Sequence, residues 1–442
     1  MKRLAIYSFF LTNFAITLGF WWYFNGESFV AGGIPVKLLM IGKLSGLIAT
    51  IFALNQLLLI GRIKWIESVF GLDKLSRVHK WTGYITLLLI VSHVSLVTRA
   101  YSLINDIGYF SQYFSFLTEY DDVIYAFIAL VILFTTVGLS ITIIRRNLKY
   151  EWWYYVHIFN YAAFFLFALH QFEYGLASSS EWFRAYWLAL YSFVALHILY
   201  FRFFKPLYNF QRFGFTIDKV ESENGVATSV YITGNNIEKF TRRSGQFMIF
   251  RFLQKGFYWQ KHPFSLSWGA HNKEIRLTAK KLGDFTELMP NLKPGTKVLV
   301  DGPHGVFTSD KIRQNKVLLI AGGIGITPLR SLSEELAGNI DLTLIYSAKT
   351  RNEAVLLEEL KNIQNFSSSQ HPFKLIEIYS DEKVTGAEHG MLNKGKLVQL
   401  VPDLTERDVF LCGPPAMMKA LKSAMAELGL PKKQLHWERF AL

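Results

Sequence analysis

The chain has 442 residues, of which 51% are hydrophobic and 16% aromatic, and its net charge is +13. Residues 1–205 are mostly apolar and the remainder has an ordinary soluble composition, which excludes both a wholly soluble and a wholly membrane-embedded protein. Much of the positive charge lies in short segments between apolar runs, which favours a membrane topology over nucleic-acid binding. The single cysteine, Cys412, excludes an intramolecular disulfide.

Six apolar runs occupy the first half, and each has about 20 residues, the length that crosses a bilayer. They are Leu4–Phe24, Val36–Ile60, Lys80–Ala100, Val123–Ile144, Trp152–Phe172 and Trp182–Phe203. The first run is long and aromatic, so we expect it to persist as a helix rather than to be cleaved as a signal peptide.

The segments between the runs alternate in charge. Lys and Arg gather at residues 2–3, 62–77, 145–149 and 202–212, whereas the other segments carry Asp106, Glu119, Asp121, Asp122, Glu173 and Glu181. The positive-inside rule therefore predicts a multi-pass plasma-membrane protein whose N-terminus and residues after Phe203 are cytoplasmic.

Four histidines stand at two depths of this bundle. His79 and His93 belong to the third run, and His157 and His170 to the fifth, which crosses in the same direction. The depths pair His79 with His157 near the cytoplasm and His93 with His170 near the outside. Imidazole is a common ligand of haem iron, so we predict two stacked bis-histidine haems. The alternative is packing histidines bonded to carbonyl groups.

The two spacings differ in helical angle. At about 100° per residue, the 14 steps from His79 to His93 return to within about 40° of one face. The 13 steps from His157 to His170 miss by about 140°. For His157 and His170 to share one face, the helix must contain a tightened turn between them, or His157 must lie at a frayed helix start. His197 has no partner at its depth and is expected to be structural.

Two cations lie in or near the outer leaflet. Lys43 is inside the second run, and Arg99 follows His93 by six residues. Each either snorkels to the headgroups or contacts an anionic group, such as a haem propionate or an electron acceptor.

Short alternating strands follow the membrane half and suggest a small antiparallel barrel. They are Phe213–Val220, Ala227–Ile232, Gln246–Phe252, Ile275–Ala279 and Lys297–Asp301. His262, Pro263, Phe264, Ser265 and Ser267 supply a flat surface and hydroxyl groups suited to an isoalloxazine ring.

A second motif in this region suits a pyrophosphate. Lys280 supplies a cation, Gly283 a bare backbone and Thr286 a hydroxyl at an expected helix start. Residues 301–305, with the sequence Asp-Gly-Pro-His-Gly, are expected to form a tight turn that closes the barrel.

The last part of the chain carries the pattern of a dinucleotide-binding domain. The strand Lys316–Ala321 leads into a loop containing Gly322, Gly323, Gly325 and Thr327, then the helix Leu329–Ala337 and the strand Leu342–Tyr346. Glycines at that position let phosphates approach a helix N-terminus.

The second strand ends near Lys349 and Arg351. Basic residues there accommodate a 2′-phosphate, which favours NADPH while leaving NADH possible. Cys412 ends the strand Val409–Cys412, before Gly413 and Pro414, where it would lie beside the nicotinamide. The alternative for Cys412 is a buried apolar thiol.

With these motifs the chain resembles the ferric reductase and NADPH oxidase family, in a compact prokaryotic form. The resemblance covers nearly the whole length and depends on the six spans, the two histidine pairs and the motifs at residues 262–265, 283–286, 322–325 and 412–414. It implies FAD on the barrel, NADPH on the last domain and two b-type haems.

The resemblance also implies that electrons pass from cytosolic NADPH to an acceptor outside, such as oxygen, a ferric chelate or a quinone. Lys43 stands where oxidases of the family carry an arginine, and a lysine cannot make a bidentate contact. Phe440 matches a family aromatic that shields the flavin. No EF-hand loop is present in the sequence, so calcium control is not expected.

We therefore expect a multidomain protein in contact with membrane lipid and without a nucleic-acid partner. Residues 1–205 form a six-helix transmembrane bundle, residues 206–311 an antiparallel β-barrel that binds FAD, and residues 312–442 an α/β domain that binds NAD(P). The competing hypotheses are a haem-free, membrane-anchored NAD(P)H flavin reductase and a transporter that senses nicotinamide redox state.

Overall fold

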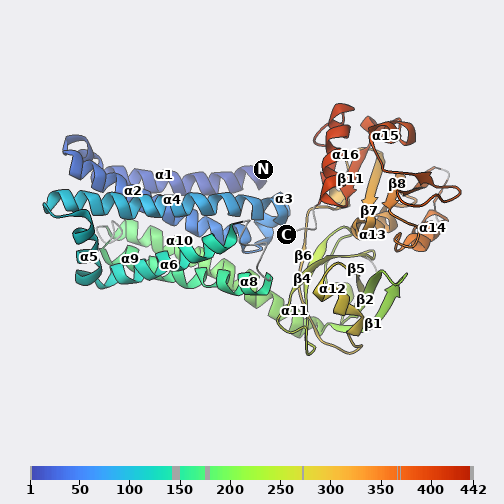
Figure 1. The fold of residues 1–442 in the computed structure, drawn as a ribbon, viewed down its shortest axis with the longest axis horizontal. Helices are drawn as coiled ribbons and strands as arrows, with labels where there is room; N and C mark the ends of the chain where they lie inside the picture. Colours follow the sequence, from blue (N-terminus) through green and yellow to red (C-terminus); the bar gives the residue numbers. More distant parts are fainter. Residues whose placement is uncertain are drawn as a thin grey trace. The chain divides into compact units, whose positions relative to one another are not determined.

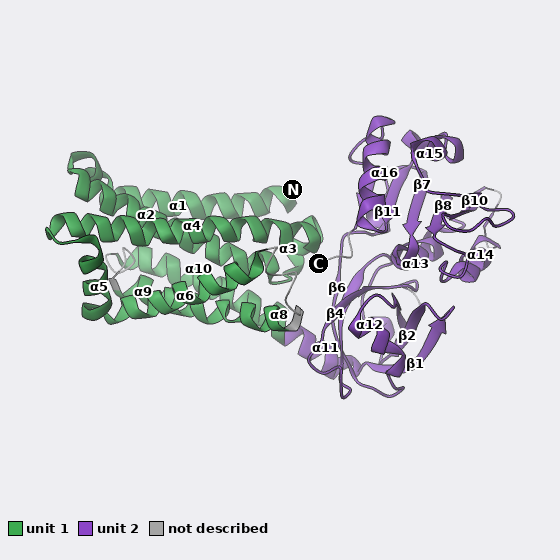
Figure 2. Ribbon diagram, viewed as in Figure 1, with its two compact units in different colours: residues 1–203 green, residues 204–442 purple. Residues whose placement is uncertain are grey.

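The computed structural model describes residues 2–141, 150–174, 180–270, 273–365, 367–368 and 370–438. The chain forms two compact units, residues 1–203 and residues 204–442 (Figure 2). Each unit is described by itself.

Unit 1 is a bundle of helices (Figure 1). Its described helices are α1 (Lys2–Ala31), α2 (Ile34–Ile60), α3 (Lys64–Phe70), α4 (Leu72–Ile104), α5 (Tyr109–Glu119), α6 (Asp121–Ser140), α8 (Tyr150–Ile158), α9 (Asn160–Tyr174) and α10 (Glu181–Ile198). Five helical segments in the described ranges are long and apolar enough to cross a membrane, namely α1, α2, α4, α6 and the segment Glu181–Phe213 that begins with α10. Three predicted runs, Leu4–Phe24, Val36–Ile60 and Lys80–Ala100, each lie within one described helix, and the sixth lies within the segment Glu181–Phe213.

The fifth predicted run is divided into α8 and α9 at Phe159. The Phe159 amide donates to the Val156 carbonyl (3.1 Å), a bond over three residues rather than four. The Asn160 side chain donates to the His157 carbonyl (3.0 Å) and accepts from the Thr136 hydroxyl (2.9 Å). This local tightening is one of the two geometries that the 13-residue histidine spacing required.

Glycines let α2 approach α4 closely. A Cβ atom on Gly42 would lie 2.8 Å from Val97, and one on Gly46 would lie 2.7 Å from His93 Nδ1. Such distances leave no room for a methyl group, so the absence of side chains at these two positions sets how near the helices come.

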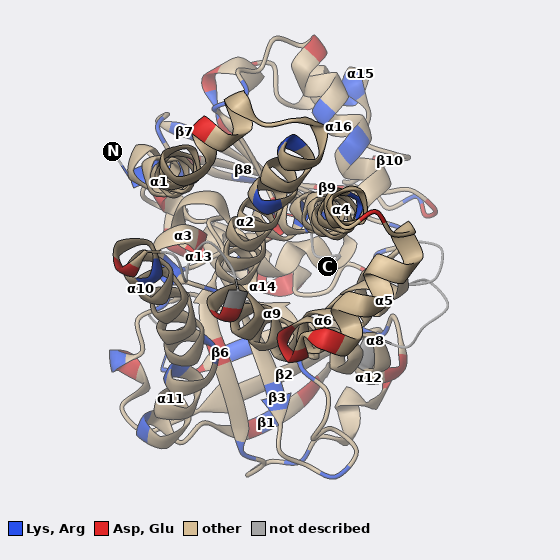
Figure 3. Cartoon of the chain, turned by 90° about the vertical axis from the view of Figure 1, so that its left-hand side faces the viewer, with Lys and Arg blue, Asp and Glu red and all other residues tan. Residues whose placement is uncertain are grey.

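Acidic residues occupy the first turns of α6 and α10, where Asp121, Asp122 and Glu181 begin the helices (Figure 3). Negative charge at a helix N-terminus is favoured by the helix dipole. The basic cluster at residues 145–149, which contributed to the predicted topology, lies outside the described residues.

Unit 2 begins with α11 (Lys205–Phe213), followed by two three-stranded antiparallel sheets. One has the order β1 (Thr216–Glu223), β2 (Ala227–Thr233), β5 (Ile275–Lys280), and the other β4 (His262–Ser265), β3 (Phe247–Phe252), β6 (Val298–His304). Two isolated bridges, Thr216 to Lys297 and Leu266 to Leu277, join the sheets. The expected barrel is therefore seen as two linked sheets around one apolar core.

Two local predictions in this region were wrong. Phe213 ends helix α11 rather than starting a strand, because Gly214 provides a left-handed C-terminal cap. Residues 301–304 belong to strand β6 rather than to a tight turn. The pairing of β6 with β3 shifts register between Asp301 and His304, so the Gly-Pro pair forms a bulge within the ladder.

The last part of unit 2 is a six-stranded parallel sheet. Its order is β10 (Glu388–His389), β9 (Phe373–Tyr379), β8 (Asp341–Ala348), β7 (Lys316–Gly322), β11 (Asp408–Cys412), β12 (Leu435–Trp437). Helices α13 (Ile326–Leu336) and α14 (Leu357–Asn365) contribute to the apolar cluster that holds Val317, and α15 (Lys394–Leu400) and α16 (Pro415–Glu427) to the cluster that holds Leu318. Neighbouring residues of a strand face opposite sides, so helices cover both faces, as the predicted α/β domain requires.

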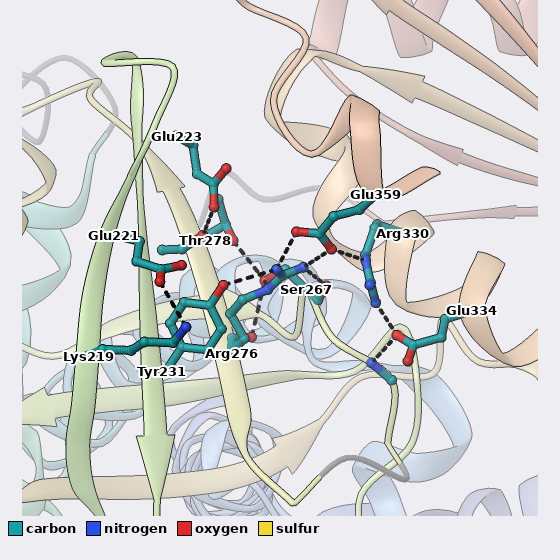
Figure 4. A network of polar contacts seen from close by, with 12 residues as sticks. Lys219, Glu221, Glu223, Tyr231, Ser267, Arg276, Thr278, Arg330, Glu334 and Glu359 are labelled. Atoms are coloured by element: carbon teal, nitrogen blue, oxygen red, sulfur yellow. Dashed lines mark hydrogen bonds and ion pairs between the residues drawn. The ribbon is translucent and has the colours of Figure 1, made fainter. Parts of the chain in front are cut away.

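A buried polar network joins the two parts of unit 2 (Figure 4). Arg276 of β5 has only 2% of its side chain exposed and makes two hydrogen bonds, of 2.6 and 2.9 Å, to the Glu359 carboxylate of α14. Burial alone would lower the pKa of Arg276, but the hydrogen bond to Glu359 raises it above the ordinary value. Arg330 of α13 contacts the same carboxylate (2.7 Å). The network thus fixes the antiparallel sheets against helices of the parallel-sheet domain.

We expect Glu359→Gln to lower the free energy of unfolding of the antiparallel domain by roughly 1–3 kcal/mol, because it leaves the buried Arg276 with a weakened partner. Glu358→Gln is the matched control, since Glu358 is 77% exposed and pairs with Lys361. Exposed pairs contribute about 0–1 kcal/mol. Denaturant unfolding followed by tryptophan fluorescence measures both, and equal effects would contradict the interpretation.

Candidate functional site

The structure brings the four predicted histidines together as two pairs. The ring centroids of His79 and His157 are 6.0 Å apart, and those of His93 and His170 are 6.4 Å apart. The ring planes of each pair are inclined by 67°. The pairs combine α4 with α8 and α4 with α9, as the depth argument expected.

Hydrogen bonds at Nδ1 set the orientation of three of these rings. His79 Nδ1 lies 3.2 Å from the Gln56 carbonyl oxygen, and His93 Nδ1 lies 2.8 Å from that of Gly42. His170 Nδ1 lies 2.7 Å from Asp122 Oδ2. A ring that donates from Nδ1 keeps Nε2 as a neutral ligand atom.

The fourth ring is held differently. His157 stacks on Trp153, with centroids 5.0 Å apart and planes inclined by 25°. Its Nδ1 atom is buried and has no hydrogen-bond partner in the part of the chain that the structure describes. Packing rather than a hydrogen bond therefore orients this imidazole.

The pairs fit the axial positions of a porphyrin iron. An imidazole nitrogen lies about 2 Å from a bound metal, and the ring centroid is about 1 Å behind it, so two opposed ligands have centroids about 6 Å apart. No group of three or more His, Cys, Asp or Glu able to hold a metal occurs within the described ranges. Two protein ligands per site suit a metal that a macrocycle also holds.

A cavity of about 530 Å³ borders the His93 and His170 pair. Lys43 of α2 is half-buried in its wall, which therefore carries a positive charge. Further lining residues include Tyr113, Asp122, Gln171 and Tyr191. The volume lies within the usual range of small-molecule sites.

His197, expected to be structural, makes no hydrogen bond with the two histidine pairs in the part of the chain that the structure describes. Its Nδ1 atom lies 2.8 Å from the Phe193 carbonyl of its own helix, and its ring packs on Phe193 with centroids 4.1 Å apart. This is the behaviour of a packing residue.

Several contributors to the histidine pairs were not identified from the sequence. Gln56 holds His79 through its backbone carbonyl, and its side-chain amide donates to the His79 carbonyl (2.9 Å). Asp122 had been assigned only to an acidic connecting segment. Its place directly before an apolar run, at the depth of His170, was the signal that could have identified it.

The motif at residues 262–265 forms strand β4. His262 packs on Phe285, with ring centroids 3.9 Å apart, and Pro263 lies opposite Ile249 of β3. Phe264 is partly buried against the domain core. Ser265 Oγ is buried without a hydrogen-bond partner among the described residues, which leaves its donor and acceptor capacity unused.

Ser267 does not join Ser265 in this arrangement. It is fully buried, and its hydroxyl shares a hydrogen bond with Thr278 (2.8 Å) and accepts from Arg276 Nε (3.1 Å). In this structure the Ser267 side chain therefore belongs to the network of Figure 4 rather than to a ligand-facing surface.

The residues expected at a pyrophosphate have partners within the protein. Lys280 Nζ lies 2.5 Å from Glu353 Oε2. Helix α12 (Asp284–Leu288) is capped by Thr286, whose hydroxyl accepts from the backbone amides of Leu282 (2.9 Å) and Gly283 (3.2 Å). A phosphate bound here would have to compete with these contacts.

Most glycines of the glycine-rich loop permit close packing of the backbone, and one leaves space beside the loop. A Cβ on Gly325 would lie 2.4 Å from the Cys412 carbonyl oxygen, and one on Gly322 would lie 2.7 Å from Pro414. A Cβ on Gly413 would lie 3.0 Å from Gly322. Only Gly323 of this set of glycines is open, and its φ of +50° favours glycine.

The other residues predicted to contact the dinucleotide differ in exposure. Thr327 is buried and donates to the Ile324 carbonyl (3.1 Å) at the start of α13. Lys349 and Arg351 are exposed after strand β8, and the Arg351 amide donates to Glu382 (2.8 Å). Both cations are thus available to an anionic ligand.

Cys412 ends strand β11 and is fully buried. Burial raises the pKa of its thiol well above the ordinary value, and the nearby Glu438 carboxylate acts in the same direction. The thiol is therefore neutral near pH 7 in this conformation. Phe440, expected to shield a flavin, lies outside the described residues.

We expect the folded protein to resist alkylation of Cys412 by maleimide at pH 8, because the thiol is both buried and protonated. Unfolding in guanidinium should expose one reactive thiol per chain. Mass spectrometry of the treated protein measures both states, and full labelling of the native protein within minutes would contradict the geometry.

Three family descriptions match successive parts of the chain. Residues 45–168 match the ferric reductase-like transmembrane component, residues 212–308 an FAD-binding domain and residues 319–423 an oxidoreductase NAD-binding domain. The first range contains three of the four paired histidines and ends two residues before His170.

Curated relatives match part of the chain. A glycine betaine monooxygenase reductase subunit of Chromohalobacter salexigens is 32% identical over 175 residues, which cover 37% of this chain and 46% of the relative. Flavohemoprotein A of Dictyostelium discoideum is 29% identical over 158 residues, which cover 35% of this chain and 37% of the relative. The chain thus spans less than half the length of these two relatives.

Solved structures with similar folds include the FAD/NAD-binding domain of a nitric oxide dioxygenase from Vibrio cholerae. It is 23% identical, with 51% of this chain and 97% of that chain covered and a TM-score of 0.46. A flavohemoglobin from Malassezia yamatoensis is 17% identical, with 89% and 98% covered and a TM-score of 0.48. The succession of a ferric reductase-like membrane component, an FAD-binding domain and an oxidoreductase NAD-binding domain matches the architecture predicted from the resemblance to ferric reductases and NADPH oxidases, and these domains indicate an NAD(P)H-dependent oxidoreductase.

Proposed function

We propose that the protein passes electrons from cytosolic NADPH, through FAD and two b-type haems, to an acceptor on the outer side of the plasma membrane. The observation that carries this proposal is the pair of imidazole–imidazole distances, 6.0 and 6.4 Å, in two places along one bundle. When bound, FAD would accept one hydride from NADPH and release its two electrons singly, and haem iron would carry them one at a time.

The spans support a crossing of the whole bilayer. His79 and His93 are 14 residues apart on α4, which corresponds to about 21 Å along a helix. Together, α8 and α9 make the fifth of six proposed crossings, with Phe159 as a local interruption. The absence of Lys and Arg from residues 100–122 of the sequence, which follow Arg99, and from residues 173–181 supports the proposed outer side.

The protein's own residues would orient the ligand atoms and prepare the acceptor side. The carbonyls of Gly42 and Gln56 hold two imidazoles with Nε2 free, and Asp122 holds a third. Lys43 places a positive charge in the cavity beside the outer pair. A compact ammonium group attracts oxygen anions, ferric chelates or propionates by charge without bidentate geometry.

In unit 2 we propose FAD on the antiparallel sheets, closed as a barrel, and NADPH on the parallel sheet. The unused Ser265 hydroxyl supports a ligand at β4. The exposed Lys349 and Arg351 support recognition of a 2′-phosphate. Cys412 at the carboxyl end of β11 stands where nicotinamide binds in such sheets.

Anaerobic mixing with NADPH tests the proposal on the purified, haem-supplemented full chain. We expect the flavin absorbance to bleach and a reduced haem band to follow. His157→Ala should leave flavin bleaching intact and remove part of the haem absorbance, because one ligand pair is broken. Flavin bleaching without any haem band in the wild type would overturn the proposal and favour a haem-free flavin reductase.

The glycine at position 46 provides a steric test. In Gly46→Ala the new methyl would lie 2.7 Å from His93 Nδ1, so His93 must move. We expect the haem-to-flavin ratio to fall from about two toward one. Gly138→Ala in α6 is the control, since nothing lies within 4 Å of the added Cβ among described atoms. An unchanged ratio in Gly46→Ala would contradict the assignment of His93.

A further inference from the structure

One of the four paired histidines has a charged partner. Asp122 Oδ2 lies 2.7 Å from His170 Nδ1, whereas His79 and His93 face neutral backbone carbonyls and His157 stacks on Trp153. The four rings are therefore not equivalent, although their pairwise distances are nearly equal.

The Asp122 carboxylate is built into the bundle rather than lying at its surface. The residue is 4% exposed, and its second oxygen, Oδ1, is buried without a hydrogen-bond partner in the described part of the chain. Its position in the first turn of α6 lets the helix dipole stabilise a negative charge. Among the described residues, the interaction with His170 is the one hydrogen bond of this side chain, so the carboxylate directs its charge mainly at that ring.

A carboxylate that accepts the Nδ1 proton makes the opposite ring nitrogen a stronger electron donor. A stronger donor stabilises the ferric over the ferrous state, because the oxidised iron carries more positive charge. Hydrogen bonding to an axial ligand is one of the ways in which proteins tune haem potentials. A neutral carbonyl partner has the same effect to a smaller degree.

We propose that Asp122 is a positioning residue that lowers the reduction potential of the haem held by His93 and His170, and so makes that haem the stronger reductant toward the outer acceptor. This inference rests on the proposed function, since it needs haem at that pair. The sequence neighbour Asp121 lacks these features, because it is exposed and the carboxylate that contacts His170 is that of Asp122.

Redox titration followed by haem absorbance tests the proposal on the purified full chain. Asp122→Asn keeps the shape but removes the charge, and Asp122→Ala removes the partner altogether. We expect each variant to raise one of the two midpoint potentials by at least about 59 mV, which is a tenfold change in a one-electron redox equilibrium. Asp122→Glu should return the value toward that of the wild type.

The matched control is Asp121→Asn, which removes an equal charge one residue away and should titrate like the wild type. His157→Ala assigns the couples, because the potential that it leaves behind belongs to the His93 and His170 pair. A shift in that couple alone supports the proposal, and an equal shift in both couples, or in Asp121→Asn, overturns it.

The remaining outcomes are also decisive. If both carboxylate-free variants keep two haems and titrate like the wild type, Asp122 does not set the potential. If both lose the haem at His170, the carboxylate holds the ligand in place, and the tuning role is overturned. If the wild type contains no haem at all, it is the proposed function that fails, and this inference falls with it.

Discussion

The bundle depends on a hydrogen bond between an imidazole on one helix and a backbone carbonyl on its neighbour. The backbone carbonyls of Gly42 and Gln56 in α2 accept from His93 and His79 of α4, respectively. The acceptors are 14 residues apart on α2 and the donors 14 residues apart on α4, in the opposite order, so the two helices are antiparallel. A carbonyl oxygen has two lone pairs, so it can accept this bond while remaining in its helical ladder. The register between α2 and α4 therefore decides where both ligand atoms lie.

The close approach of α2 and α4 requires residues without side chains on α2. Gly42 and Gly46 lack a Cβ where α4 passes, and a methyl at either site would overlap Val97 or His93. Glycine lowers helix stability by about 1 kcal/mol relative to alanine. Leu54, Leu58 and Trp187 are buried in the core of the same bundle, and such burial is the main source of stability of packed helices. Local helix propensity is thus sacrificed where the histidine must fit.

Much of the architecture was predictable because it follows from the lengths of the apolar runs and the spacing of the histidines. The apolar runs predicted most helices, and the helix rise together with the shared crossing direction of the third and fifth runs predicted the pairing of His79 with His157 and of His93 with His170. The hydrogen-bond partners were not predictable in this way, since Gln56 is 23 residues from His79 and Asp122 is 48 residues from His170. Such contacts arise only when helices pack. The turn at residues 301–305 was misassigned because Gly and Pro also form bulges, and only the pairing with β3 distinguishes the two.

On the proposed electron path, the unequal environments of the two pairs would have an energetic consequence. A carboxylate at His170 would disfavour the reduced state of a haem held there, so it would oppose transfer from the pair at His79 and His157 while strengthening delivery to an acceptor. An inside-negative membrane potential favours outward movement of negative charge, by about 2.3 kcal/mol per charge per 100 mV over the full bilayer. The step along α4 covers about 21 Å of a hydrocarbon core about 30 Å thick, so most of that energy acts between the two pairs. In the proposed scheme the membrane potential therefore offsets the opposition that Asp122 would introduce, and the acceptor would receive an electron of higher energy than an arrangement with four neutral partners would deliver.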